Sequence, residues 1–288
     1  MALIPPFFLD CVVAIGAPAD DGTHWAASGF LYGHRSNPGE EGGKTYWLCL
    51  VTNRHVFDGL RVAVLRFNPE AAEPARQYQV ALIQPDGSSV WIGHPDPKID
   101  VAVMAINGNL LKADGIKFQF FEDDGHTATL ARMTELGIAE GDGVFALGFP
   151  LGLVGGDRNY VIVRQGVIAR VRDTLASASS DFLVDMTIFP GNSGGPVILR
   201  PESTAIDGTL SQVSSNLLGI VSSYLPYQDI AISTQTKRPR IIFEENTGLA
   251  SIFPVDSIDE TISEHRRRGK AEAPPAPPED NKPGERST

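Results

Sequence analysis

One serine, Ser193, lies in a glycine-rich stretch whose residue types suit nucleophilic catalysis. The stretch, residues 190–196, reads Pro-Gly-Asn-Ser-Gly-Gly-Pro and lies between two apolar runs that are typical of β-strands. Glycine lets the backbone turn several N–H groups toward one point, and acyl transfer needs such donors for the oxygen that becomes negative. The sequence therefore predicts a nucleophile, Ser193, in an oxyanion hole formed by Gly191, Asn192 and Ser193. Its donors would be the N–H groups of Gly191 and Ser193.

A histidine and an aspartate precede this serine in an order that suits a catalytic triad. His55 directly follows the strand-like run 47–51, and Asp100 stands at the head of another, 101–103. The order His, Asp, Ser is the one in which Asp orients His and His accepts the serine proton in the chymotrypsin template. We therefore expect His55, Asp100 and Ser193 to act together.

The serine stretch also fits the G-x-S-x-G turn of α/β-hydrolases, which gives an alternative interpretation. In that fold the acid and the histidine follow the serine along the chain. The only histidine after Ser193 is His265, inside a charged run near the end of the sequence. Chain order therefore argues against the α/β-hydrolase fold.

Together these motifs resemble those of trypsin-like serine peptidases of the chymotrypsin fold, and within that group the HtrA (Deg) branch is the most similar. The resemblance implies an all-β fold of two six-stranded antiparallel β-barrels with a short linker helix and a C-terminal helix. It also implies a serine endopeptidase that works through a covalent acyl-enzyme, with no metal or organic cofactor required. The resembling segments are 52–56, 96–103, 141–150, 190–196, 218–222, 248–250 and 253–254.

The spacing of strand-like runs and turns gives the expected domain organisation. We expect a peptidase domain over residues 1–265, with an N-terminal barrel at about 8–106, a linker at about 107–140, and the second barrel and helix at about 141–265. The linker helix is expected at 127–136. Residues 200–216 and 226–246 are expected to be polar surface loops. A basic and then Pro-rich tail, 266–288, is expected to be disordered, and no segment is left for the PDZ domain that HtrA proteases usually carry.

The resemblance also places a substrate pocket. Thr187 falls where trypsin keeps an acidic pocket floor, and Tyr224 falls where many trypsins keep a glycine, so we expect a short pocket and cleavage after small or medium apolar residues. The substrate backbone is expected to add as a strand beside residues 221–223, and Ser222 is expected to support Asp100. The full expected set is Thr187, Ile188, Phe189, Val221, Ser222, Ser223 and Tyr224.

Composition limits the other partners and the compartment. The formal charge of −11 comes without a basic stripe, so nucleic acid is not an expected partner. The N-terminal residues lack the pattern of a signal peptide or a membrane span, so no membrane partner is expected. Both cysteines, Cys11 and Cys49, stand in apolar runs and are expected to be buried free thiols, which favours a reducing compartment. We therefore expect a cytoplasmic protein whose partners are protein or peptide substrates.

Two alternatives to a constitutive enzyme remain at this point. One is a latent protease that an activating partner protein releases, with the glycine-rich residues 151–156 as a candidate mobile loop. The other is a pseudoprotease that binds extended peptides without cutting them. Asn192 stands where secreted trypsins keep the aspartate that pairs with a newly cleaved N-terminus, so activation by that ion pair is not expected.

Overall fold

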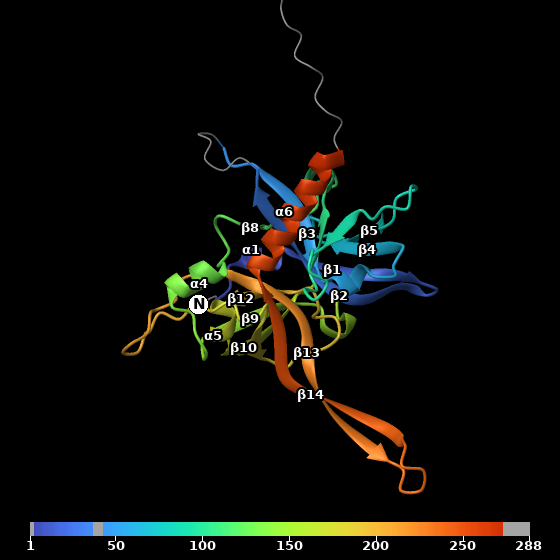
Figure 1. Ribbon diagram of the computed structural model, residues 1–288. Coiled ribbons are helices and arrows are strands. Elements are labelled where there is room, and N and C mark those ends of the chain that lie inside the picture. The colour runs from blue at the N-terminus through green and yellow to red at the C-terminus, as the bar shows by residue number, and fades with distance from the viewer. Residues whose placement is uncertain (1–2, 37–42, 273–288) are drawn as a thin grey trace, which may run out of the picture.

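The N-terminal lobe is built from short strands that turns separate. The computed structural model describes residues 3–36 and 43–272, and this lobe is the blue and teal part of Figure 1. Its eight strands form one sheet in the order β5-β4-β1-β2-β3-β7-β6, antiparallel throughout, with β8 added in parallel to β2. The strands are β1 (Val12–Ala19), β2 (Gly22–Arg35), β3 (Tyr46–Thr52), β4 (Val62–Phe67), β5 (Arg76–Ala81), β6 (Trp91–Gly93), β7 (Ala102–Ala105) and β8 (Phe121–Glu122).

The C-terminal lobe is a closed barrel in the order β10-β11-β14-β13-β12-β9. The expected pair of chymotrypsin-like barrels is confirmed at this level of the architecture. One detail differs, because β5 and β6 do not pair with each other within the described chain and the N-terminal sheet curls without closing. The barrel strands are β9 (Gly143–Gly148), β10 (Ile162–Arg170), β11 (Phe182–Asp185), β12 (Pro196–Leu199), β13 (Leu217–Ile232) and β14 (Pro239–Pro254).

Strand alternation gives the N-terminal sheet two buried faces. Successive side chains of a strand point to opposite faces. In β1, Val13 and Ile15 pack into the core of the N-terminal lobe, whereas Val12 and Ala14 pack into a second cluster that includes residues of both lobes. A third cluster fills the C-terminal barrel. The contact between the two lobes is therefore apolar. A strand such as β1 contributes alternate side chains to this contact and to the core of its own lobe.

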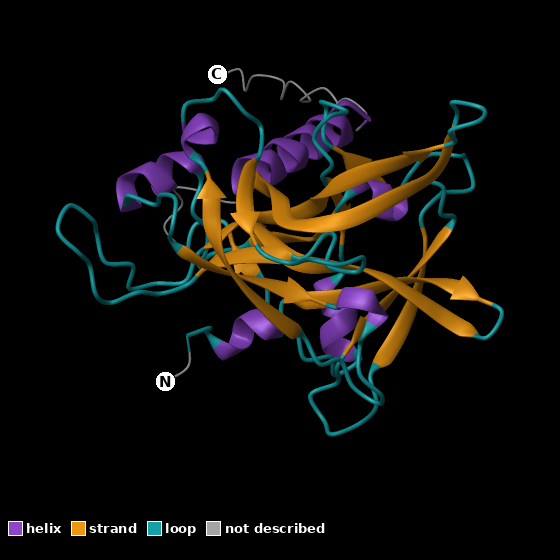
Figure 2. Ribbon diagram, turned by 90° about the horizontal axis from the view of Figure 1, so that it is seen from below, coloured by secondary structure: helices purple, strands orange, loops and turns teal. Residues whose placement is uncertain are grey.

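Helices lie around the strands rather than between them (Figure 2). The expected linker helix is present as α4, where the Thr129 hydroxyl caps the first turn by accepting from the Arg132 N–H and Gly137 ends it at a φ of 67°. The linker also holds the shorter α3, which the sequence did not indicate. The helices are α1 (Pro6–Leu9), α2 (Arg54–Phe57), α3 (Gly108–Ala113), α4 (Leu130–Leu136), the 3-10 turn η1 (Pro150–Gly152), α5 (Arg172–Leu175) and α6 (Val255–Glu272).

The C-terminal helix α6 extends further than the sequence indicated. It buries Val255, Ile258 and Ile262 in the cluster between the lobes, and the Tyr32 hydroxyl donates to Asp259 Oδ1 at 2.7 Å. Burial raises the pKa of Asp259 to about 6. The helix includes residues 266–272, which were expected to begin the tail, because helical pairs such as that between Glu264 and Arg267 support another turn. The rest of the expected tail, 273–288, lies outside the described residues.

Residues 226–246 form a projecting β-hairpin rather than the expected polar loop. Here β13 and β14 continue past the barrel as a two-stranded ribbon, the orange projection in Figure 1. The reason is the β-branched and aromatic content of both strands, which includes Ile230, Ile232 and Phe243. Residues 200–216, in contrast, form an irregular and mostly exposed segment.

Two smaller expectations can be compared with the structure. Cys11 and Cys49 are both buried and unpaired, as expected. Among the helices of residues 3–36 and 43–272, none has the length and apolar character that a bilayer crossing requires.

Candidate active site

The antiparallel pairing of β3 with β7 brings His55 and Asp100 together. Thr52, at the end of β3, pairs with Ala102, at the start of β7, so the residues just beyond these ends are neighbours. His55 lies on α2, and its Nδ1 is 2.6 Å from Asp100 Oδ2. The His55 backbone N–H donates to Asp100 Oδ1 at 3.1 Å. Both carboxylate oxygens are therefore used to orient one imidazole.

This contact shifts the titration of both groups. The hydrogen bond to Asp100 raises the pKa of His55, and burial opposes it. Burial acts to raise the pKa of Asp100, but the hydrogen bonds from His55 outweigh it and hold that pKa below its usual value. The His55 side chain is 54% exposed, so the imidazole is accessible from solvent. An oriented, accessible imidazole can accept a proton from a neighbouring hydroxyl.

Asn53, which the sequence analysis did not single out, supports the aspartate from behind. It is fully buried, and its side-chain N–H donates to the Asp100 carbonyl oxygen at 2.7 Å. The sequence signal that could have indicated it is its position just before the helix that carries His55, because Asn is favoured at the start of a helix.

The nucleophile candidate Ser193 points at a backbone carbonyl. Its Oγ donates to the Ser222 carbonyl oxygen at 3.2 Å. No hydrogen bond links Ser193 Oγ to His55, although both residues are described. Serine rotates among three staggered χ1 wells, and catalytic hydrogen bonds often form only in the complex with substrate. The structure therefore shows the contact between His55 and Asp100, and Ser193 Oγ is bonded to the Ser222 carbonyl instead of to His55.

The turn before Ser193 leaves two backbone donors available. Neither the Gly191 N–H nor the Ser193 N–H donates a hydrogen bond within the part of the chain that the structure describes. The Pro190 carbonyl accepts from the Leu151 N–H at 2.7 Å, and because a trans peptide points its C=O and N–H in opposite directions, the Gly191 N–H points away from Leu151. Gly191 has a φ of 98°, which favours glycine.

Asn192 lies between the two expected donors and has another contact. Its N–H donates to the Phe189 carbonyl at 3.0 Å, so it closes the turn instead of facing an oxyanion. The two N–H groups on either side of it are the available donors. The structure thus places Asn192 in the loop that holds the donors, not among the donors.

Ser28 of β2, also missed from the sequence, holds the serine loop against the N-terminal lobe. It is fully buried, its N–H donates to the Ser193 carbonyl at 2.9 Å, and its Oγ donates to the Gly191 carbonyl at 2.7 Å. The same Oγ accepts from the Phe149 N–H at 2.9 Å, and Thr52 Oγ1 donates to the Ser28 carbonyl at 2.8 Å. The sequence signal that could have indicated Ser28 is a polar residue within a mostly apolar strand.

The expected pocket residues 187–189 lie between the end of β11 and the serine loop. Thr187 and Phe189 are exposed, and Ile188 is buried in the barrel core. The Thr187 carbonyl accepts two hydrogen bonds from Arg164, at 3.1 and 2.7 Å, and the Arg164 guanidinium lies 5.4 Å from the centre of the Phe189 ring. A fixed positive charge therefore stands next to the segment expected to form the pocket floor.

The expected residues of β13 are arranged along its edge at the serine loop. The Val221 backbone is paired with the loop through Gly194 N–H and Gly195 C=O, both at 2.9 Å. Ser223 is exposed, and the partly buried Tyr224 donates its hydroxyl to Glu244 at 2.8 Å. The Ser222 hydroxyl makes no hydrogen bond to Asp100, although both residues are described, so the expected support is not formed there; Asn53 supports Asp100 instead.

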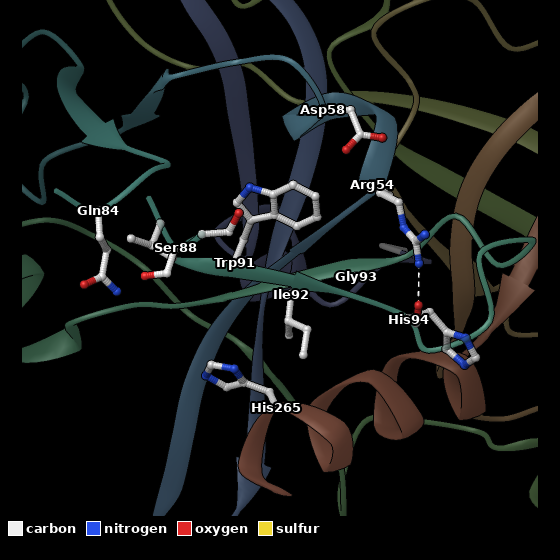
Figure 3. A pocket seen from close by; sticks show the side chains of 11 residues that line it. Arg54, Asp58, Gln84, Ser88, Trp91, Ile92, Gly93, His94 and His265 are labelled. Carbon is white, nitrogen blue, oxygen red and sulfur yellow. Dashed lines mark hydrogen bonds between the residues drawn. The ribbon is translucent and has the colours of Figure 1, made fainter. Parts of the chain in front are cut away.

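Two cavities are lined in part by His55 or by its neighbour Arg54. The one in Figure 3 is lined by Arg54, Trp91, His94 and His265 among others, and contains none of the three triad candidates; in it, Arg54 donates to the His94 carbonyl. A second cavity, of about 260 Å³, touches the His55 imidazole between β1, β2 and α2. No cluster of His, Cys, Asp and Glu among the described residues could hold a metal ion.

Comparisons with known proteins can be set beside this geometry. A sequence profile of the trypsin-like peptidase domain matches residues 27–204, more than half of the chain and a span that includes His55, Asp100 and Ser193. A search of curated protein sequences gave no match.

Several solved structures are similar to the chain. The HtrA-type protease AlgW with a decapeptide is 17% identical, with a TM-score of 0.46, and the match covers 91% of this chain and 66% of that one, just under two thirds. The MamO protease domain from Magnetospirillum magneticum, in its apo form, is 15% identical with a TM-score of 0.43, covering 88% and 96%. The Rv3671c protease in an inactive form is 13% identical with a TM-score of 0.42, covering 89% of each chain.

Removing the Ser28 hydroxyl should loosen the serine loop. Ser28→Ala leaves the buried Phe149 N–H and Gly191 C=O unpaired, which costs about 1–3 kcal/mol of unfolding free energy and should slow the modification of Ser193 by a fluorophosphonate. Urea unfolding and labelling rates measure the two effects. Ser36→Ala, at an exposed hydroxyl, is the matched control. An unfolding free energy and a labelling rate equal to the control's would contradict this role.

The Asp100 contact should set the acid limit of the site. Because His55 must be neutral to accept a proton, reactivity should fall as the pH drops through its raised pKa. Asp100→Asn should lower that pKa, so the imidazole signal in an NMR titration should move to lower pH. Asp96→Asn, on the same loop, keeps the contact and should leave the titration unchanged. Equal His55 titrations in the two variants would show that Asp100 does not raise the pKa.

Proposed function

The chain belongs to the trypsin-like peptidase family, and from this premise we propose that it is a serine endopeptidase that cuts peptide bonds of protein substrates. The observation that carries the proposal is the serine loop, whose two N–H groups are available next to Ser193. The hydrogen-bonded pair of His55 and Asp100 supports it. Together they supply a nucleophile, a general base and an oxyanion site.

In the first half of the reaction, Ser193 Oγ leaves the Ser222 carbonyl and attacks the carbon of the scissile carbonyl. His55 Nε2 accepts the hydroxyl proton, and Asp100 stabilises the resulting imidazolium. The carbonyl oxygen becomes negative and accepts hydrogen bonds from the Gly191 and Ser193 N–H groups, where loss of one donor typically costs a factor on the order of a hundred or more in rate. The C–N bond then breaks, and His55 returns the proton to the leaving amine.

In the second half, water attacks the Ser193 ester. His55 accepts a proton from this water, the oxyanion forms again at the same two N–H groups, and the ester C–O bond breaks. The proton returns to Ser193 Oγ, which restores the free enzyme and releases the acid product. No group beyond the chain and water takes part in these steps.

The edge of β13 offers a place for the substrate backbone. In this structure Ser193 Oγ donates a hydrogen bond to the Ser222 carbonyl. When Ser193 Oγ moves to attack the substrate, that carbonyl becomes free to accept a substrate N–H. An extended peptide can thus add to β13 as a further strand. This arrangement would hold the scissile bond next to Ser193.

We further propose that the enzyme cleaves after small or medium apolar residues. The Arg164 guanidinium, fixed on the Thr187 carbonyl, disfavours a second positive charge, so Lys and Arg are poor fits. Tyr224, whose hydroxyl is held by Glu244, adds bulk at the pocket's expected entrance. We therefore expect a short pocket that accepts residues such as Val, Ala or Leu.

The function is tested by replacing the nucleophile. Wild-type protein should react with a fluorophosphonate and digest casein, and Ser193→Ala should lose all labelling and reduce proteolysis by on the order of a thousandfold or more. Ser214→Ala, at an exposed serine, should behave as wild type. Undiminished proteolysis by Ser193→Ala would contradict the proposal. Well-folded wild type that neither labels nor cuts would instead favour a latent protease or a peptide-binding role.

The pocket is tested with a peptide library that varies the residue before the cleaved bond. Wild type should prefer Val, Ala and Leu, and Tyr224→Gly should extend the preference to larger apolar side chains because the entrance opens. Tyr227→Gly, three residues further along β13, is the control that should keep the wild-type profile. A wild-type profile dominated by Arg or Phe would overturn the specificity proposal.

A further inference from the structure

The hairpin formed by residues 226–246, called here the outer ribbon, contacts the barrel at its base, where the Asn246 side chain donates to the Ile188 carbonyl. Inside the barrel, β13 pairs with β12 and β14 pairs with β11. Within the described chain, the ribbon parts of β13 and β14 pair only with each other (Figure 1). Beyond its base, both edges of the ribbon are therefore unpaired within the described residues. A two-stranded ribbon alone is marginally stable in water, and open edges tend to add strands.

The ribbon also exposes an unusual amount of apolar surface. Six large apolar side chains are each 47–60% exposed. Contiguous exposed apolar residues of this kind mark interaction surfaces. The six are Tyr227, Ile230, Ile232, Ile241, Ile242 and Phe243.

The β14 edge of the ribbon is complementary to itself. Residues 238–246 read Arg-Pro-Arg-Ile-Ile-Phe-Glu-Glu-Asn, with basic residues before Ile242 and acidic residues after it. In an antiparallel, two-fold pairing centred on Ile242, Arg240 faces Glu244 of the second copy. In the same register Ile241 faces Phe243, and Ile242 faces its own counterpart. Opposite charges and apolar residues placed in this way stabilise cross-strand pairs.

The β13 edge lacks this property. A two-fold pairing centred on Ile230 would place Asp229 opposite Ala231 and Gln228 opposite Ile232, so a charge would face an apolar residue. In β14, moreover, the carboxylate of Glu244 is held by the Tyr224 hydroxyl at 2.8 Å and by the Gln228 amide at 3.1 Å. The Glu244 side chain is thus held on the face of the ribbon that it shares with Gln228.

We propose that the outer ribbon is a dimerisation surface whose occupant is a second copy of this chain, paired edge to edge through β14 about Ile242. The two ribbons form a four-stranded sheet around a two-fold axis. Ile242 pairs with Ile230 within each ribbon, so both residues of both copies share one face of this sheet. The apolar residues that one ribbon exposes thereby gain neighbours.

Charge reversal tests this register. Arg240→Glu places two glutamates opposite each other at both symmetry-related positions, and Glu244→Arg places two arginines there. Each single variant should therefore be monomeric, with self-association weakened by about tenfold or more. A mixture of the two single variants restores an Arg–Glu contact at both positions and should form a heterodimer. Wild type should be a dimer by sedimentation and light scattering.

Two controls match the charge changes. Glu245→Arg faces the uncharged Pro239 in this register, and Lys237→Glu lies in the turn beyond the paired stretch, so both should remain dimers. Circular dichroism checks that every variant is folded. Wild type that stays monomeric up to about 100 µM, single variants that keep the wild-type mass, or a mixture that stays monomeric would each overturn the proposal.

Discussion

The buried hydrogen bonds of Ser28 are the contact on which the candidate site depends. One residue of the N-terminal sheet holds the carbonyls of Gly191 and Ser193, both in the serine loop, and also accepts from Phe149 of the C-terminal barrel. A buried polar group without a partner is costly, so these groups fix the distance between the lobes. His55 comes from one lobe and Ser193 from the other. The proposed function requires the two to meet, and the Ser28 contacts join the segments that carry them.

The resting state of the site is explained by competition for one hydroxyl. In this structure Ser193 Oγ donates to the Ser222 carbonyl, whereas the proposed mechanism requires it to donate to His55. A substrate strand added to β13 would need that same carbonyl. In the proposed mechanism, substrate binding and release of the nucleophile are coupled through this one acceptor, and the Asp100 contact orients the imidazole.

The fold class could be predicted from the sequence and is confirmed, whereas the complete triad stays a prediction. The triad candidates stand in motifs with a fixed chain order, and apolar runs of strand length located most of both sheets. Ser28 and Asn53 could not be found in this way, because their roles depend on contacts between distant segments. The outer ribbon was missed because Pro226 and charged residues interrupt its apolar pattern. The length of α6 was missed because a run of arginines is equally compatible with a solvated helix and with a tail.

The most direct measurement of this account is a crystal structure of the chain after fluorophosphonate treatment. An assembled site predicts a phosphonyl group on Ser193 Oγ, with one phosphonyl oxygen within about 3 Å of both the Gly191 and the Ser193 nitrogens. It also predicts that the Ser28 contacts are unchanged. A modified Ser193 whose phosphonyl oxygen lies away from both nitrogens, or a Pro190–Gly191 peptide that turns its carbonyl into the site, would contradict it.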